Sequence, residues 1–220
     1  MDYLKTKELF KEGHSIAYGF LCGFEYPWQA LGCIKDFILE LGSTLPSDEY
    51  EERTEGVWIS RGATVDESAH IEPPCIICDG AQVRHCAYIR GSAIVGKGAV
   101  VGNSTELKNC ILFDGAQAPH YNYVGDSILG YRAHMGAGSI TSNVKGDKSE
   151  VRILGKIHTG QRKIGAMVGD GAEIGCGAVL NPGTVVGTGA RIYPLTSVRG
   201  YLMPNHIYKG KGDAVEICAE

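Results

Sequence analysis

An internal period of six residues constrains the fold of this chain more than any other feature. Aliphatic residues recur at this spacing over two stretches, and a small residue, usually alanine, lies two positions before nearly all of them. The aliphatic positions are Ile59, Val65, Ile71, Ile77, Val83, Ile89, Val95, Val101 and Leu107, and then Val168, Ile174, Leu180, Val186, Ile192 and Val198. The period fits neither an amphipathic helix nor an alternating strand, but it fits a solenoid in which each hexapeptide forms one short strand and one turn. We therefore predict an all-β solenoid with the aliphatic side chains in its interior.

Charge and hydropathy exclude some classes of partner. The formal net charge of −4 argues against a nucleic acid as the main partner. The N-terminus, Met1 to Lys5, lacks the basic and apolar regions of a signal peptide, and no run reaches the roughly 18 apolar residues that span a bilayer. We expect a cytoplasmic protein without a membrane or nucleic-acid partner.

The chain has 8 cysteines at irregular spacings. Without a leader sequence, reduced thiols are expected. Cys75-x-x-Cys78 lacks the second cysteine pair or the spaced histidines of a zinc site, and Cys75 occupies a small position of the repeat. We interpret the pair as structural and expect no metal.

The region before the repeat predicts a helix over residues 27–41. Pro27 suits a first helical turn, and an apolar face follows it. The charged segment from Asp48 to Arg53 is interpreted as a connection into the first coil. We assign residues 1–55 to a helical N-terminal cap or arm, 56–207 to the solenoid and 208–220 to a C-terminal tail.

The repeat has two interruptions, and these are where a binding site is expected, because a regular coil has no spare backbone to form a pocket. In the first, from Leu107 to Met135, two steps of the period shorten to five residues. In the second, over 142–163, the pattern stops and lysine and arginine are frequent. We predict an inserted, projecting basic loop over 142–163.

Motifs in and near these interruptions resemble one family. Thr105 to Asn109, Pro119 to Asp126 and Gly136 to Asn143 look like the acetyltransferase domain of bifunctional glucosamine-1-phosphate acetyltransferase / N-acetylglucosamine-1-phosphate uridyltransferases. Gly160 to Ala166 resembles a loop of their archaeal-type sugar-phosphate nucleotidyltransferase relatives. The resemblance covers roughly residues 56–200. It implies a left-handed parallel β-helix with coils of about 18 residues, a homotrimer that binds acetyl-CoA between subunits, and acetyl transfer to an amino-sugar phosphate such as glucosamine-1-phosphate.

Stacking of successive coils places Arg90 next to Lys108. Glu72, one coil before Arg90, is then the only acidic partner in the column. The two cations repel each other unless an anion lies near them, and a phosphate suits that position. A solvated column on an outer face is the alternative, and the spacing leaves both interpretations open.

The same counting places His120 one coil from Ala137, within Gly136-Ala137-Gly138. An imidazole is suited to take a proton from an attacking amine near neutral pH. A backbone N–H in the neighbouring coil can stabilise the negative charge that develops on a thioester oxygen. A lone histidine is more often an ordinary surface or core residue, so its position at an interruption is what favours the catalytic interpretation.

The resemblance assigns further roles. His120 matches the catalytic base, and Asn143 matches a residue that orients the site. The acceptor then attacks acetyl-CoA directly, and neither Cys110 nor Cys176 acts as a nucleophile. The residues that match substrate positions are Arg90, Lys108, Tyr123, His134 and Lys148, and those that match acetyl-CoA contacts are Ala137 and Cys176. Because His134 stands where the bacterial family has an asparagine, the acceptor sugar is left open.

Residues 1–55 are too few for a nucleotide-binding α/β domain and contain no glycine-rich phosphate loop, so no nucleotidyltransferase activity is expected. A γ-type carbonic anhydrase shares the fold, but none of the 7 histidines forms the close pair of that family. A non-catalytic subunit that binds a sugar phosphate or nucleotide, or serves assembly, stays open as an alternative.

Overall fold

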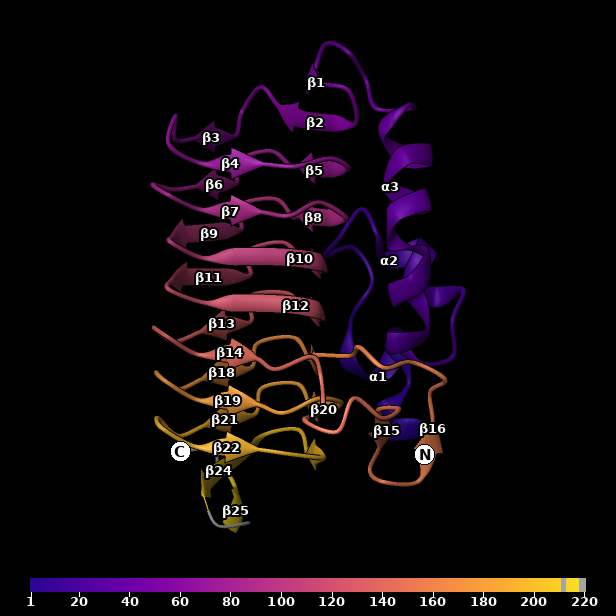
Figure 1. The fold of residues 1–220 in the computed structure, drawn as a ribbon, viewed down its shortest axis with the longest axis vertical. Helices are drawn as coiled ribbons and strands as arrows, with labels where there is room; N and C mark the ends of the chain where they lie inside the picture. Colours follow the sequence, from indigo (N-terminus) through magenta and orange to yellow (C-terminus); the bar gives the residue numbers. More distant parts are fainter. Residues whose placement is uncertain (211–212, 218–220) are drawn as a thin grey trace.

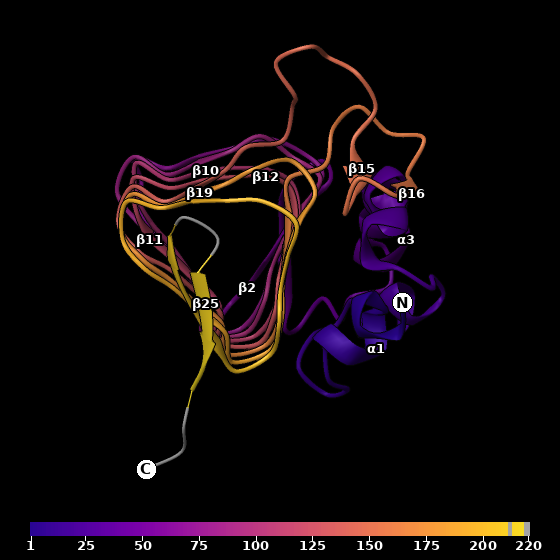
Figure 2. The same ribbon diagram turned by 90° about the horizontal axis from the view of Figure 1, so that it is seen from below.

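The computed structural model describes residues 1–210 and 213–217. Within them, short parallel strands wind into a left-handed β-helix of about 8 turns with a triangular cross-section (Figures 1 and 2). Val57 pairs with Cys75, and Cys75 in turn pairs with Ala93, so each coil repeats in register with the next. The predicted all-β solenoid is confirmed.

The strands form three faces, named here by their surroundings. The front face contains β4 (His70–Ile71), β7 (Tyr88–Ile89), the first halves of β10 (Glu106–Leu112) and β12 (Tyr123–Leu129), β14 (Ile140–Thr141), β19 (Val179–Leu180) and β22 (Ser197–Val198). The covered face contains β2 (Val57–Ser60), β5 (Cys75–Ile77), β8 (Ala93–Val95), the second halves of β10 and β12, β17 (Ala166–Val168), β20 (Thr184–Val186) and β23 (Tyr201–Leu202). The open face contains β3 (Thr64–Val65), β6 (Gln82–Val83), β9 (Val100–Asn103), β11 (Gln117–His120), β13 (His134–Met135), β18 (Glu173–Ile174), β21 (Arg191–Ile192) and β24 (His206–Gly210).

The interior is filled by the residues that the period marks. Ile77, Val95 and Leu112 lie in one buried cluster that runs through the coils. The small residues Ala81 and Ala93 are fully buried in the same cluster. The shortened steps are accommodated because β10 and β12 run continuously around a corner, which joins the front and covered faces into one sheet.

The covered face is apolar on both sides. Its outward residues, which include Ile76, Ile94, Ile111 and Ile128, are fully buried against N-terminal helices. Figures 1 and 2 show these helices lying along one side of the triangle. The helices are η1 (Asp2–Leu4), α1 (Thr6–Leu9), α2 (Tyr18–Cys22), η2 (Pro27–Cys33) and α3 (Ile34–Gly42).

Two expectations for the N-terminal region need correction. The predicted helix begins at Pro27, but its first part is the 3₁₀ helix η2, and α3 follows from Ile34. The segment from Asp48 to Arg53 is largely a strand, since β1 (Tyr50–Thr54) pairs antiparallel with β2. A turn through Gly56, which has a φ of 78°, makes this hairpin possible. The hairpin pairs the edge of β2 that no coil covers.

The inserted loop leaves the coil after β14 and returns at β17. It projects from the solenoid and packs against the N-terminal helices (Figure 2). Val151 and Ile153 are buried there, and the Gln161 amide donates a 3.1 Å hydrogen bond to the Trp28 carbonyl. The loop contains an antiparallel hairpin of β15 (Arg152–Ile153) and β16 (Ile157–His158).

At the C-terminal end, β24 continues the last coil to Gly210, and β25 (Asp213–Glu216) pairs antiparallel with it. The tail expected over 208–220 therefore includes the end of a coil strand and β25; residues 211–212 and 218–220 lie outside the described residues. Among the described residues, no helix has the length and apolar character needed to cross a bilayer.

Candidate functional site

A column of exposed residues follows the corner between the open and front faces, and we call it the His120 corner. β11 ends at His120 and β12 begins at Tyr123, so a short turn joins them. The buried Asn122 fixes this turn: its Oδ1 accepts the His120 N–H at 3.0 Å, and its Nδ2 donates to the Gly136 carbonyl at 2.8 Å. His120 is thereby tied to the next coil through the backbone, while its side chain is exposed.

The His120 corner brings together three residues from successive coils. Gln117 pairs with His134, which puts Ala137 directly one coil beyond His120, as the stacking predicts. His134 pairs in turn with Glu173, which puts Cys176 one coil beyond Ala137. All three corner residues are exposed.

The backbone of the Ala137 turn is open on its outer side. The Gly138 N–H donates to the His120 carbonyl at 2.9 Å, and the Ala137 carbonyl accepts the Gly177 N–H at 2.8 Å. In the part of the chain that the structure describes, the Ala137 N–H has no acceptor. A Cβ built on Gly138 would meet no atom within 4 Å. A free N–H on an exposed, glycine-flanked turn fits the oxygen of an approaching thioester.

A second cluster occupies the corner between the front and covered faces, and we call it the Asp126 corner. The Asp126 side chain is only 4% exposed and accepts the Lys108 ammonium group at 3.0 Å and 3.2 Å. It also accepts the side-chain amides of Asn109, at 2.8 Å, and Asn143. Asn109 and Asp126 both have left-handed φ values, of 49° and 48°, where the shortened steps turn the corner. Neither residue was singled out from the sequence, and the shortened steps are the signal that marks their positions.

Gly125 allows this cluster to form. It is in register with Lys108, so no side chain separates the lysine from Asp126 in the next coil. A Cβ on Gly125 would come within 2.4 Å of the Tyr123 hydroxyl, so the Tyr123 side chain lies over the glycine. That hydroxyl accepts a 3.2 Å hydrogen bond from Asn143. Burial and the nearby carboxylates of Asp126 and Glu106 raise the pKa of Tyr123, so the phenol keeps its proton near neutral pH.

Strand register puts Lys108 one coil from Arg90, as the stacking predicts, but the expectation that Glu72 is the acidic partner of Arg90 is wrong. Arg90 binds Glu106 at 2.8 Å, and Glu72 instead accepts the Tyr88 hydroxyl at 2.6 Å. Both contacts join residues 16 positions apart, because side chains on adjacent coils lean diagonally. Arg90 and Lys108 therefore each have a carboxylate partner, and their mutual repulsion no longer requires an added anion.

Other residues singled out from the sequence lie outside these two corners. His134 is on the open face, where its Nδ1 lies 2.9 Å from Glu173. Lys148 is exposed in the inserted loop and has a φ of 55°. Among the described residues, no hydrogen bond or ion pair joins His134 or Lys148 to the Asp126 cluster. The structure brings together Lys108, Tyr123 and Asn143.

A cavity of about 480 Å³ adjoins the Asp126 corner. Asn109 and Asp126 line one wall, Gly32 of the N-terminal region lies on another, and the loop contributes Arg162 and Lys163. Both of these cations are exposed. Arg162 and Lys163 thus add positive charge beside the Asp126 cluster. From the sequence, these two residues were expected only to contribute to a basic loop.

Metal chemistry has no evident site in the described residues, where no group of His, Cys, Asp and Glu is placed to hold an ion. Cys75 and Cys78 are fully buried, and burial raises the pKa of the Cys78 thiol to about 12. Cys110 is also fully buried, and burial raises its pKa to about 12. A thiol so protonated and enclosed is a poor nucleophile.

Comparison with known proteins gives matches along the solenoid. Residues 71–164 match the family model described as the GMPPB C-terminal domain. The chain is 35% identical over 155 residues to the bifunctional protein GlmU of Methanococcus maripaludis strain C5, covering 68% of this chain and 38% of the relative. It is 30% identical over 111 residues to the bifunctional sugar-1-phosphate nucleotidylyltransferase/acetyltransferase of Sulfurisphaera tokodaii, covering 49% of this chain and 28% of the relative.

Among solved structures, the acetyltransferase domain of PglB from Neisseria gonorrhoeae in complex with acetyl coenzyme A gives a TM-score of 0.33 at 19% identity, covering 68% of this chain and 52% of that chain. The chain spans well under half the length of the two curated relatives, at 38% and 28%. Over its repeat, the chain resembles the acetyltransferase, left-handed β-helix domain of bifunctional GlmU-type proteins and related sugar-phosphate nucleotidyltransferases.

Proposed function

We propose that this chain is an acyl-CoA-dependent N-acetyltransferase that acts on an amino-sugar phosphate such as glucosamine-1-phosphate. The observation that carries the proposal is the His120 corner, where an exposed imidazole lies one coil from a free backbone N–H. The name of one curated relative, bifunctional sugar-1-phosphate nucleotidylyltransferase/acetyltransferase, supports acetyl transfer.

In this proposal His120 takes the proton from the attacking amine. The Ala137 N–H stabilises the negative charge on the thioester oxygen, and the Asn122 side chain holds the turn that positions both. Acetyl-CoA supplies the activated acyl group, and the small side chains of Ala137 and Cys176 leave room for it at the corner. The amine attacks the thioester carbonyl directly: the C–N bond forms, the C–S bond breaks, and CoA leaves as the thiol with the proton that His120 took up, so no nucleophilic cysteine is needed. The burial and raised pKa of Cys110 agree with that role for the amine.

The sugar phosphate is proposed to bind on the front face, near Arg90, Lys108, Tyr123 and Asn143. Because both cations already have carboxylate partners, a phosphate there competes with Glu106 and Asp126. The exposed cations Arg162 and Lys163 raise the local positive potential that favours this exchange.

A homotrimer is part of the proposal. Tyr121, 67% exposed, lies beside His120, and Leu195, 85% exposed, donates its N–H to the Cys176 carbonyl. Large apolar side chains at both ends of the column are typical of a surface that another chain covers. His134 and Lys148 lie apart from the Asp126 cluster within one chain. In a trimer, they can contact a substrate that is bound between two chains.

The test is CoA release from acetyl-CoA with a panel of amino-sugar phosphates. His120→Ala is expected to lower turnover about 100-fold or more, the contribution of a general base. The matched control is His85→Ala, because His85 is exposed on the same corner and its Nδ1 is 2.8 Å from the Ser68 hydroxyl. Cys176→Ala is expected to keep substantial activity. Equal losses for His120→Ala and His85→Ala, or total loss for Cys176→Ala, would contradict the mechanism.

A non-catalytic subunit that binds a sugar phosphate or nucleotide, or serves assembly, is the second candidate. The neutralisation of Arg90 and Lys108 by Glu106 and Asp126 favours the assembly role, because neither cation is then free to hold the phosphate of an acceptor. Absence of turnover on every acceptor, together with no binding of acetyl-CoA, would select this candidate.

A further inference from the structure

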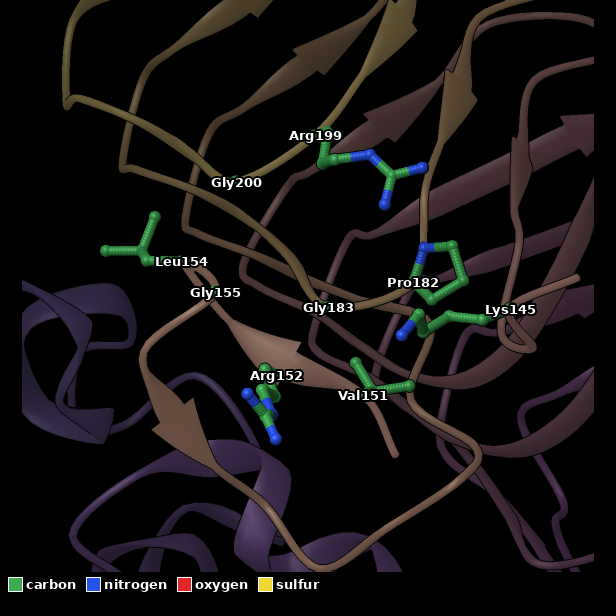
Figure 3. A pocket seen from close by; sticks show the side chains of 9 residues that line it. All are labelled: Lys145, Val151, Arg152, Leu154, Gly155, Pro182, Gly183, Arg199 and Gly200. Carbon is green, nitrogen blue, oxygen red and sulfur yellow. The ribbon is translucent and has the colours of Figure 1, made fainter. Parts of the chain in front are cut away.

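A separate cavity lies between the inserted loop and the last coils. It has a volume of about 250 Å³ and is distinct from the cavity at the Asp126 corner. Figure 3 shows the side chains around it. The loop contributes Lys145, Val151, Arg152 and Leu154, and the coils contribute Pro182 and Arg199.

Close contact between loop and coil builds this cavity. Gly183 has a φ of 79°, and a Cβ there would approach Val151 Cγ1 to 2.8 Å and Ile153 Cδ1 to 3.0 Å. The Gly183 N–H also donates to the Gly165 carbonyl at 2.8 Å, where the loop rejoins the solenoid. The cavity is therefore a defined junction of two segments and not an open surface.

The charge in the cavity is positive. Within residues 1–210 and 213–217, three cations from two separate segments line it and no carboxylate does. The Lys145 ammonium group donates to the Ser149 hydroxyl at 2.5 Å, but it lies 3.7 Å from Asp147, and Arg152 lies 3.9 Å from Glu150, so neither carboxylate is in close contact with its cation. Among the described residues, the partner of Arg199 is the neutral Asn181 amide oxygen at 3.4 Å. The cations thus keep most of their capacity to bind an anion.

Apolar surface accompanies this charge. Val151 is buried, Leu154 is partly buried, and both line the cavity with the Pro182 ring. The volume of about 250 Å³ lies below the range of roughly 300–1,000 Å³ that encloses a drug-sized ligand. The cavity therefore suits the phosphoryl end of a small molecule better than a whole nucleotide.

We propose that Lys145, Arg152 and Arg199 form a second anion site, which binds a phosphate or diphosphate group of a small molecule. Because the cations come from both the loop and the coil, the bound anion holds the loop to the solenoid. Asn143 lies at the start of the same loop, so occupation of this site stabilises the segment that supplies Asn143 to the Asp126 corner. The inference does not rest on acetyl transfer, since binding alone tests it.

The experiment measures equilibrium binding of inorganic pyrophosphate at low salt. Arg199→Ala is expected to weaken pyrophosphate binding about tenfold or more, because it removes a charge-assisted contact. Arg199→Lys keeps the charge without the planar fork, so its affinity is expected between those of wild type and Arg199→Ala. The control is Arg191→Ala, because Arg191 is exposed on the open face of the same coil and is expected to leave affinity unchanged.

A second readout is hydrogen exchange over 145–155, where pyrophosphate is expected to slow exchange in wild type and not in Arg199→Ala. Acetyl-CoA is titrated in parallel to identify the source of the phosphate. Weakening of both ligands by Arg199→Ala assigns the site to the co-substrate, and weakening of pyrophosphate alone assigns it to a separate ligand. Equal pyrophosphate affinity in wild type and Arg199→Ala, or no saturable binding, overturns the proposal.

Discussion

The Asp126 carboxylate joins one cation and two amides at a buried corner. Asp126→Ala removes the acceptor of Lys108, Asn109 and Asn143, of which Lys108 is only 26% exposed. Because a largely buried cation then loses its partner, we expect the free energy of unfolding to fall by about 3 kcal/mol. Urea unfolding followed by circular dichroism measures the change.

Glu106→Ala is the matched control for this loss. It breaks the Arg90 pair, whose side chains are 44% and 33% exposed, and an exposed pair contributes less than about 1 kcal/mol. If Asp126→Ala lowers the free energy of unfolding no more than Glu106→Ala does, the buried contacts of Asp126 do not stabilise the protein more than an exposed ion pair.

Individual contacts were the least predictable part of the candidate site. Counting the period placed Ala137 next to His120, because backbone register depends only on the number of residues per coil. The same counting gave the wrong partner for Arg90, because a long side chain leans toward a diagonal neighbour. The shortened steps marked the corner of Asp126, but its burial depends on Gly125 and on a loop residue, Asn143.

At the scale of elements, the sequence of the covered face contains a second pattern besides the six-residue period: its outward positions are apolar. Ile76, Ile94, Ile111 and Ile128 occupy its outward positions, and an apolar residue at each of these positions indicates a covering layer. The helix over 27–41 was predicted, and its docking on this face was not. Which helix covers which face is decided by contacts between distant residues, so the local pattern does not specify it.

Ile94→Ala tests this covering layer. Ile94 is an outward residue of β8 and is fully buried under the helices, so its truncation is expected to lower the free energy of unfolding by about 2–4 kcal/mol. Gln82→Ala, an exposed outward position on the open face, is expected to change it by less than about 0.5 kcal/mol. Thermal and urea unfolding measure both variants, and equal small effects would show that the helices add little to the stability of the solenoid.

At the scale of the whole molecule, the six-residue period predicted the architecture because every hexapeptide repeats the same alternation of buried and exposed positions. The inserted loop was predicted to project, but its packing on the N-terminal helices depends on long-range contacts such as that of Gln161 with Trp28. A junction of this kind also forms the cavity around Arg199. The sequence locates the interruptions of the period. It does not predict the surfaces that the inserted loop forms with the N-terminal helices and the last coils.

Assembly is the property of the whole molecule that the proposed function most requires. Leu195 is 85% exposed beside Cys176, so covering it would bury a large apolar side chain next to the proposed acetyl-CoA site. We expect light scattering after size exclusion to give the mass of three chains for wild type. Leu195→Glu places a charge in the interface and is expected to yield monomers and to lower CoA release in parallel.

Met203→Glu is the control for that substitution, because Met203 is 55% exposed and precedes β24, away from the His120 corner. It introduces the same charge, so any effect of charge alone on solubility or stability appears in both variants. A trimer that survives Met203→Glu but not Leu195→Glu places the interface along the His120 corner. A monomeric wild type would require each chain to hold a complete site. Equal dissociation of both variants would contradict an interface along the His120 corner.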